Sequence, residues 1–304
     1  MSANLGDEFL QVLAGGAPKK APKKAKPRKA AALADWRSDL ILKSEDPESD
    51  VQPCEHNAMV ILRNCHADAG IAFDTFLDRP VYRGRPVSDE DETAITAKIQ
   101  RQESVAGFSV GMVRRALRLI AKENPTDALV AHVNGLPPHD GVARLDTWLA
   151  RYAAANDASY TRRVSRKFVV QMIARALQPG AKADVVLVLT GAQGARKSSM
   201  VEALTCRSEF FADEDADLGN KEAAMGLAGK WLIELAEFDL GKRATVDRLK
   251  AFLSRRSDHF VRKFENSPVD IPRRCVFVAT TNDREFLSDT TGNRRFWPVE
   301  VGAQ

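Results

Sequence analysis

VVLVLTGAQGARKSS, residues 185–199, is the stretch that decides the fold of the second half of the chain. A run of β-branched and aliphatic residues ends at Thr190. A turn with two glycines follows, and a lysine and two serines then lead into an apolar helical pattern. A buried strand, a glycine loop and a helix N-terminus in this order are typical of a phosphate-binding loop, because backbone N–H groups then point at phosphate oxygens. The stretch therefore predicts a nucleotide site.

The spacing fits G-x-x-x-x-G-K-[ST], with Arg196 in place of the second glycine. Lys197 is expected to reach the outer phosphates, and Ser198 to ligate Mg²⁺. Arg196 either crowds the phosphates or adds a cation, and it costs about 1 kcal/mol or more if this position needs a positive φ. The residues predicted to bind the nucleotide are Gly191, Gln193, Gly194, Ala195, Arg196, Lys197, Ser198 and Ser199.

Composition is that of a globular chain with a sizeable core, since 44% of its 304 residues are hydrophobic and 28% are charged. No apolar run approaches the roughly 20 residues of a membrane span, and the N-terminus lacks a secretory signal pattern. Four scattered cysteines favour a reducing cytoplasm. A zinc cluster of Cys54, His56, Cys65 and His66 is an alternative, although its spacing matches none of the usual paired knuckles.

Positive charge is concentrated near the N-terminus. Residues 18–29 hold seven Lys or Arg and no acid, although the whole chain has a net charge of only +4. Such a Pro- and Lys-rich segment cannot bury apolar surface, so residues 1–50 are predicted to be a disordered basic tail and linker. The tail serves either as a solubilising arm or as a sequence-independent hook for DNA phosphates.

Two folded regions are predicted after the tail. Residues 51–180 are expected to form a small, mostly helical domain with short β-type runs. Its predicted runs are 58–62, 71–73 and 80–82, and its predicted helices are 89–99, 110–121, one starting at Pro125, 143–154 and 164–177.

From residue 181 to 304 strand and helix patterns alternate, which predicts an α/β domain with a parallel sheet and flanking helices. The expected strands are 185–189, 231–235, 275–279 and 296–301, and the expected helices are 197–204, 221–227 and 246–253.

Polar side chains end two of these strands. Glu234 and Glu237 lie in WLIELAEF, residues 231–238. Acids at the end of a strand beside a phosphate loop suit Mg²⁺ binding and orientation of an attacking water; alternatively, Glu234 pairs with an arginine. Asn282 lies near the end of CVFVATTND, residues 275–283, and is predicted to sense the γ-phosphate, with an Asx turn as the alternative.

Basic residues suggest two further roles. Arg294 and Arg295 precede an aromatic strand and could place a guanidinium fork at a neighbouring subunit's γ-phosphate, or form a solvated edge. Between the acidic and sensor strands, cations alternate with Phe260 and Phe264, which suits a loop that grips single-stranded DNA, or an ordinary charged surface. The cations predicted to bind DNA are Lys250, Arg262 and Lys263.

In this order the phosphate loop, ELAEF, LKAFLSRRSDHFVRKF, PRRCVFVATTND and GNRRFWPVEV resemble the virulence-associated protein E family of phage and mobile-element replication proteins. The resemblance covers roughly residues 51–304. It implies a P-loop AAA+ core like that of superfamily 3 helicases, working with ATP and Mg²⁺ as a DNA-translocating ring, expected to be a hexamer, alongside other replication proteins. It also implies roles for individual residues: phosphate and Mg²⁺ binding by Lys197 and Ser198, acid chemistry by Glu234 and Glu237, sensing by Asn282, a finger at Arg294 or Arg295, and DNA contact at Arg262 and Lys263.

Departures from the family pattern leave other functions open. Besides Arg196, the absence of a primase-type segment before residue 51 leads us to expect a helicase-only form, and the end soon after GNRRFWPVEV is expected to weaken ring closure. A catalytically weak nucleotide-binding scaffold that recruits replication partners is the alternative function. A small P-loop kinase is a third, although no acceptor site or lid is recognisable.

Overall fold

The computed structural model describes residues 36–46, 48–102, 107–214, 221–236, 249–262, 267–283 and 293–302. The predicted tail before residue 36, Glu237 and Lys263 lie outside these residues. Within them, no helix combines the length and the apolar character needed to cross a lipid bilayer.

The first part of the chain packs helices against a small sheet. The sheet has four short strands in the order β3-β2-β1-β4, and its core includes Ile61, Leu62, Val113 and Leu117. Its elements are η1 (Trp36–Asp39), α2 (Glu55–Cys65), η2 (Ala67–Ala69), β1 (Ala72–Asp74), β2 (Arg79–Tyr82), β3 (Arg85–Pro86), α3 (Asp89–Gln102), α4 (Val110–Glu123), β4 (Pro125–Thr126) and α5 (Ala128–Asn134).

Two sequence predictions in this part are wrong. The run 58–62, predicted as a strand, lies within α2. A short apolar run cannot distinguish the two structures; here Ala58, Ile61 and Leu62 share the face of a helix that packs against α4. The helix predicted from Pro125 begins at Ala128, because residues 125–126 pair with β1 and the Asp127 side chain then accepts the N–H of Val130 at 2.8 Å as an N-cap.

The second part is a five-stranded sheet in the order β11-β5-β10-β7-β6, in which every neighbouring pair is parallel. The four predicted strands form, and β6 is an additional edge strand. The elements are α6 (Trp148–Ala153), α7 (Ser159–Leu177), β5 (Val186–Thr190), α8 (Lys197–Ala203), η3 (Ser208–Phe210), β6 (Phe211–Glu214), α9 (Lys221–Gly226), β7 (Leu232–Leu235), a helical segment at 249–253, β8 (Ser257–Val261), β9 (Pro268–Pro272), β10 (Val276–Thr281), η4 (Asn293–Arg295) and β11 (Phe296–Glu300).

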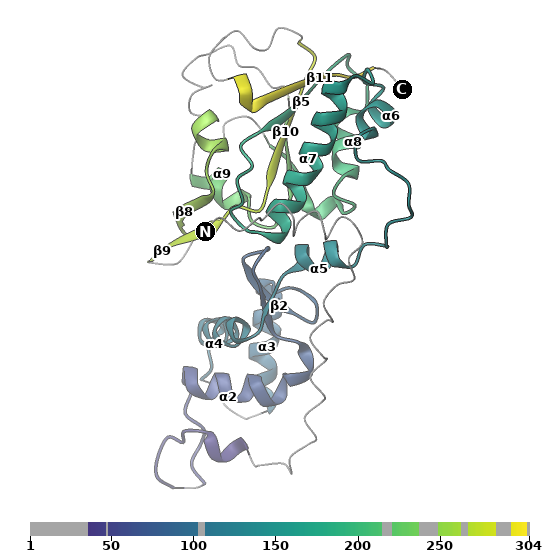
Figure 1. The fold of residues 1–304 in the computed structure, drawn as a ribbon. Coiled ribbons are helices and arrows are strands. Elements are labelled where there is room, and N and C mark those ends of the chain that lie inside the picture. The colour runs from purple at the N-terminus through teal and green to yellow at the C-terminus, as the bar shows by residue number, and fades with distance from the viewer. Residues whose placement is uncertain are drawn as a thin grey trace, which may run out of the picture.

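Alternating residues of β5 face two apolar layers, which is why all five are buried. Leu187 and Leu189 pack in a cluster with residues of α6, α7 and α8, whereas Val186 and Val188 pack with Leu227, just after α9, and with the helical segment 249–253. Figure 1 shows α7 and α8 on one side of the sheet and α9 on the other. The α/β fold class with a parallel sheet is therefore confirmed.

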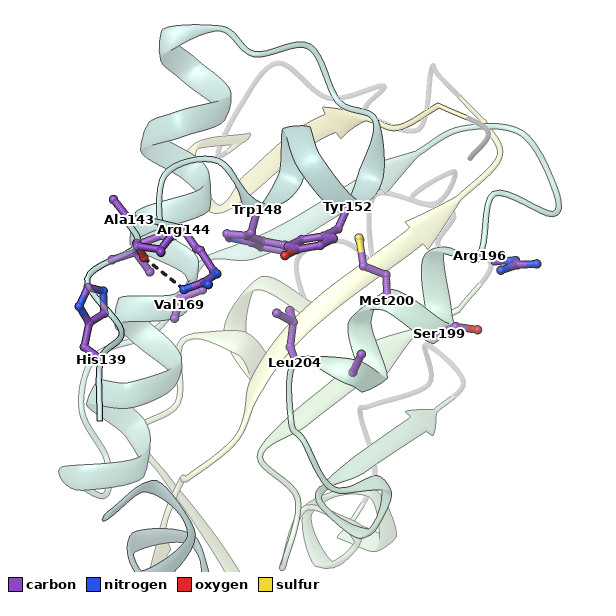
Figure 2. A pocket seen from close by; sticks show the side chains of 13 residues that line it. His139, Ala143, Arg144, Trp148, Tyr152, Val169, Arg196, Ser199, Met200 and Leu204 are labelled. Carbon is purple, nitrogen blue, oxygen red and sulfur yellow. Dashed lines mark hydrogen bonds between the residues drawn. The ribbon is translucent and has the colours of Figure 1, made fainter. Parts of the chain in front are cut away.

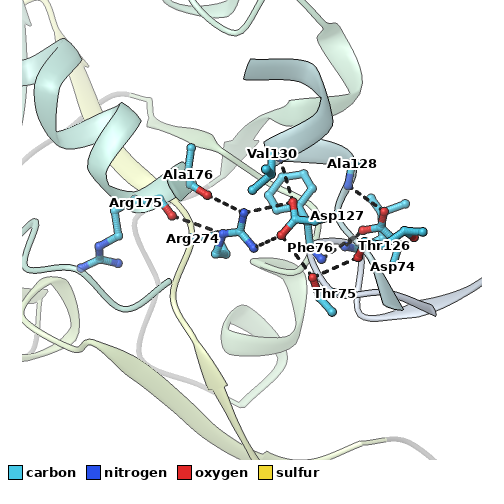
Figure 3. A network of polar contacts seen from close by, with 11 residues as sticks. Asp74, Thr75, Phe76, Thr126, Asp127, Ala128, Val130, Arg175, Ala176 and Arg274 are labelled. Atoms are coloured by element: carbon cyan, nitrogen blue, oxygen red, sulfur yellow. Dashed lines mark hydrogen bonds and ion pairs between the residues drawn. The ribbon is translucent and has the colours of Figure 1, made fainter. Parts of the chain in front are cut away.

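A partly buried ion pair joins the two parts (Figure 3). Arg274, next to β10, donates to both carboxylate oxygens of Asp127 at 2.6 and 3.1 Å and to the carbonyl oxygen of Ala176 at 2.7 Å. Asp127 also accepts the hydroxyl of Thr75 at 3.1 Å. The Asp127 carboxylate thus caps α5, accepts a hydrogen bond from Thr75 just after β1, and pairs with Arg274 next to β10 of the five-stranded sheet.

Candidate functional site

Strand register places the ends of β5, β10 and β11 level with one another at one edge of the sheet. Thr190 at the end of β5 is level with Thr281 of β10 on one side and with Glu300 of β11 on the other. The glycine loop, residues 191–196, leaves from this central position. Ligands of open parallel sheets bind at the carboxyl ends of the strands, so the loop lies where such a ligand is expected.

The glycine loop is shaped by three unusual backbone positions. A Cβ at Gly191 would lie 2.5 Å from the carbonyl oxygen of Val301, so only glycine fits there without a shift. Gly194 and Arg196 both have positive φ, 84° and 51°. The motif has its second glycine at this position, and the backbone here has the left-handed conformation that favours glycine. Arg196 occupies the position as the N-cap of α8, and its side chain is exposed.

Lys197 is held against the loop by three oxygen acceptors. Its Nζ donates to the carbonyl oxygens of Gly191 and Ala192 at 2.8 and 3.1 Å, and to Oδ1 of Asn282 at 2.9 Å. Partial burial lowers the pKa of Lys197, and the negative charge of Glu234 opposes that shift. Lysine and Asn282 therefore meet at the predicted phosphate position.

Glu234 is a fully buried acid in contact with α8. Its Oε1 accepts the hydroxyl of Ser198 at 2.8 Å and that of Thr280 at 2.5 Å, while its Oε2 is buried without a partner. Neither partner is an arginine, so among the described residues the arginine-paired alternative is not found. Thr280 was not singled out from the sequence, although it lies two residues before Asn282 on the same side of β10, and that spacing was the available signal.

A cavity of about 360 Å³ lies beside these groups. Its wall combines the glycine loop and the start of α8 with the ends of β7 and β10. The lining residues are Gln193, Gly194, Ala195, Arg196, Lys197, Ser198, Ser199, Ala236, Thr280, Thr281 and Asn282. The structure thus brings the predicted loop residues and the sensor residue together, with Glu234 beneath them.

Arg294 and Arg295 lie at the opposite end of the sheet. They immediately precede β11, whose first residue is level with Val186 at the start of β5. Five strand residues, roughly 16 Å, separate that level from the glycine loop. Arg295 donates from Nε to the hydroxyl of Ser254 at 3.1 Å, whereas Arg294 is exposed. In this arrangement neither arginine can contact a phosphate bound in the glycine loop of its own chain.

The residues predicted to contact DNA have intramolecular surroundings. Lys250 is buried, and Arg262 donates to both carboxylate oxygens of Asp78 at 2.6 and 2.5 Å. Arg262 directly follows β8, which pairs with β9 as a two-stranded hairpin. DNA contact at these residues stays a prediction.

The zinc alternative is not supported. Among the residues that the structure describes, no three His, Cys, Asp or Glu side chains are grouped to hold a metal ion. His66 contacts the hydroxyl of Tyr82 at 2.9 Å, and His56 contacts the carbonyl oxygen of Asp39 at 2.9 Å. These histidines therefore have separate structural partners.

Comparison with known proteins identifies one family. A family model described as the virulence-associated protein E-like domain matches residues 133–304, more than half of the chain. No curated protein matches the chain.

Solved structures give a more distant likeness. The apo structure of the NrS-1 C terminal region (305-718) is 15% identical with a TM-score of 0.49, over 80% of this chain and 62% of that one. The A form apo structure of the same region is 15% identical with a TM-score of 0.46, over 77% of this chain and 58% of that one. The chain thus spans less than two thirds of the length of these structures.

Proposed function

The chain belongs to the virulence-associated protein E-like domain family, and on that premise we propose that it is an ATP-driven motor that translocates on or unwinds DNA during replication of a phage or mobile element. The core is proposed to be a P-loop ATPase of the AAA+ type. The observation that carries this proposal is the convergence of Lys197, Ser198 and Asn282 on one cavity, with Glu234 hydrogen-bonded to Ser198 beneath it.

Each of these residues has a chemical role in the proposal. The N–H groups of the glycine loop and the ammonium of Lys197 bind the phosphates, whose negative charge they offset. Asn282, already in contact with Lys197, presents an amide that can orient the attacking water. The proposed mechanism therefore depends on positioning and charge stabilisation, which are the main sources of catalysis in phosphoryl transfer.

The site fits Mg²⁺. Mg²⁺ prefers oxygen ligands and usually takes only one or two carboxylates from the protein. Ser198 Oγ and the Glu234 carboxylate are such donors, and the unpartnered Oε2 of Glu234 has capacity for a water or ion. When bound, the ion would neutralise charge on the phosphate oxygens. Glu237, the second acid predicted here, lies outside the described residues.

Arg294 or Arg295 is proposed to act on the nucleotide of an adjacent subunit. A guanidinium can stabilise charge on the transferring phosphoryl group when a neighbouring chain supplies it. The distance of both residues from their own loop favours that arrangement, and it requires a homo-oligomer, for which we propose a hexameric ring. Single-stranded DNA is the proposed partner of the hairpin that contains Arg262.

The proposal is tested by measuring ATP hydrolysis with and without single-stranded DNA. We expect turnover that DNA stimulates and that Lys197→Ala abolishes, because the outer phosphates lose their cation. Lys122→Ala, on the exposed side of α4, is a matched control and should leave turnover unchanged. Turnover by the Lys197→Ala variant at the wild-type rate would contradict the proposal.

One observation favours a second function, a nucleotide-binding scaffold that recruits replication partners. Arg196 has a left-handed backbone conformation in the loop, and its side chain could hinder productive phosphate binding. Under that function ATP would bind in a Lys197-dependent way, but no hydrolysis would follow with any DNA. Phosphorylation of a nucleotide acceptor without DNA dependence would instead indicate a kinase.

A further inference from the structure

A second and larger cavity adjoins α8. It measures about 910 Å³, within the range of small-molecule pockets. Its wall is mainly apolar and includes Trp148, Tyr152, Val169, Met200, Ala203 and Leu204. Figure 2 shows Trp148 and Tyr152 of α6 across from Met200 and Leu204 at α8. The sheet's own core is complete without this space, because the strand residues are already buried.

The two cavities meet at the first turn of α8. Arg196 and Ser199 line both the phosphate cavity and the apolar one. Lys197 and Asn282 line the phosphate cavity but not the apolar one, and they face the outer phosphates in the proposed function. The inner phosphate, and the sugar attached to it, must therefore leave toward Ser199, where the apolar cavity begins.

Three of the polar side chains in the wall of the apolar cavity already have intramolecular partners. Trp148 donates its Nε1–H to the carbonyl oxygen of Ser165 at 3.1 Å. Arg144 donates to both carboxylate oxygens of Asp140 at 2.7 Å, and Nδ1 of His139 accepts the N–H of Gly141 at 3.1 Å. Few groups remain to hydrogen-bond the edge of a ligand, whereas aromatic and aliphatic surface is plentiful.

We propose that this apolar cavity receives the sugar and base of the nucleotide whose phosphates lie in the glycine loop, and that it holds the base by shape and stacking. The inference rests on the proposed function and assigns the part of the site that the motifs leave undefined. The base lies against Met200 and Ala203 on α8, with Tyr152 opposite. Ala203 is four residues beyond Ser199, roughly 6 Å along the helix axis, within reach of a sugar and base.

This mode of binding implies weak selection among bases. Apolar pockets discriminate between similar ligands by factors of about 10 to 200, whereas pockets that hydrogen-bond a ligand group discriminate by about 10⁴-fold or more. We therefore expect the affinities of ATP and GTP to lie within about tenfold of each other. A preference for ATP of a thousandfold or more, on the order seen for hydrogen-bonded recognition, would overturn the stacking mode.

The test compares ligands with and without a base by titration calorimetry. ATP, GTP and inorganic tripolyphosphate, which has no sugar or base, are each titrated into the wild type and into Ala203→Trp. Ala203 is exposed to the cavity, so its replacement fills space without deleting core atoms. We expect ATP and GTP to bind about tenfold or more weakly to Ala203→Trp and tripolyphosphate to bind unchanged.

A pair of tyrosines supplies a matched control. Tyr152 and Tyr160 are 47% and 48% exposed, and only Tyr152 lines the cavity. Tyr152→Ala should weaken ATP binding by about tenfold, as loss of a stacking partner does, and Tyr160→Ala should not.

The outcomes separate the two proposals. If wild type binds ATP and tripolyphosphate, Lys197→Ala weakens both, and Ala203→Trp and Tyr152→Ala change neither, then the base pocket is wrong while the phosphate site stands. If no triphosphate ligand binds the folded wild type, both proposals fail. If Ala203→Trp changes only the sedimentation of the protein, the cavity belongs to a contact between copies of the chain, which also overturns a base pocket.

Discussion

Arg196 holds a backbone conformation that favours glycine, with φ at 51° and ψ at 31°. A residue with a Cβ is penalised there by roughly 1–2 kcal/mol. Glycine would avoid that penalty, but it would also increase the conformational entropy of the unfolded chain. This second effect lowers the free energy of unfolding by about 0.4–1 kcal/mol. The native loop is therefore under strain at the residue that forms the N-cap of α8.

Replacing Arg196 by glycine should raise the free energy of unfolding by about 0.5–1 kcal/mol, the balance of these two effects. Urea denaturation of the nucleotide-free protein measures it. Arg196→Ala keeps the Cβ and removes the rest of the side chain, so it retains the backbone penalty and should be no more stable than the wild type. A glycine variant less stable than the alanine variant would contradict backbone strain at this position.

Glu234→Gln tests the proposed metal site without changing side-chain shape. The amide can keep contacts to Ser198 and Thr280 but lacks the negative charge that attracts a cation. With Mg²⁺–ATP at about 100 times its Kd, wild type should be stabilised by about 2.7 kcal/mol, and Glu234→Gln by much less. Thermal unfolding with Mg²⁺–ATP, with ATP and EDTA, and without ligand makes the comparison. Equal Mg²⁺-dependent stabilisation of both proteins would exclude Glu234 from the metal site.

At the scale of elements, β11 and the glycine loop are fitted to each other. The N–H of Val301 donates to the carbonyl oxygen of Thr190 at 2.8 Å, and the Val301 carbonyl oxygen then passes close to Gly191. Because a Cβ at Gly191 would lie 2.5 Å from that oxygen, either the loop or the end of β11 would have to move.

Gly191→Ala should therefore lower the free energy of unfolding by about 2 kcal/mol, as overpacking does, and weaken nucleotide binding. Gly111→Ala in α4 is the matched control, since its Cβ would meet nothing nearer than Arg115 Nη1 at 3.5 Å and alanine favours a helix. Denaturation of both variants compares the effects. A Gly191→Ala variant as stable as wild type would show that the loop relaxes freely.

At the scale of the whole molecule, Asp127 and Arg274 join residues 147 positions apart. Burial raises the pKa of Asp127, but hydrogen bonds from Arg274 and from the N–H of Val130 outweigh it, so the pKa is lowered. A carboxyl group whose pKa is lower in the folded state stabilises the fold above its unfolded pKa, near 3.9. That stabilisation is lost as pH falls through the folded pKa.

Asp127→Asn should cost about 3 kcal/mol at pH 7, because it leaves the nearly buried Arg274 without its counter-charge. The difference from wild type should shrink as the pH falls below about 4, through the lowered folded pKa of Asp127, because the wild-type carboxyl then also becomes neutral. Denaturation at several pH values gives both quantities. Asp157→Asn breaks an exposed pair with Arg162 and should have a small effect; an equal loss in both variants would contradict the structural role of Asp127.

Assembly can be tested by mixing two inactive variants. Lys197→Ala lacks a working loop but retains Arg294, and Arg294→Ala lacks the finger but retains the loop. If the arginine acts on the neighbouring subunit, mixed oligomers contain complete sites, so ATP hydrolysis should reappear on mixing. Arg294 is the sharper choice because Arg295 is bonded to Ser254. Full activity of Arg294→Ala alone would exclude this role.

Part of the fold and part of the candidate site could be predicted from the local sequence pattern. A buried strand, a glycine turn and a helix start are adjacent in sequence, so residues 185–199 alone predicted β5, the loop and α8. Polar residues near the ends of aliphatic strands likewise predicted Glu234 and Asn282, because parallel strands share one carboxyl edge. The motif left open whether Arg196 needs a positive φ, and the structure shows that it has one.

Contacts between distant residues were decided only by tertiary structure. Arg262 was predicted as a DNA contact, yet its partner Asp78 lies 184 residues away, and no local pattern reports such a neighbour. The run 58–62 became helix because packing against α4 selected between two structures that a short apolar run permits equally. Sequence alone thus determined the order of elements and the chemistry at their ends, whereas the partner of each side chain depended on strands and helices that meet only after the chain has folded.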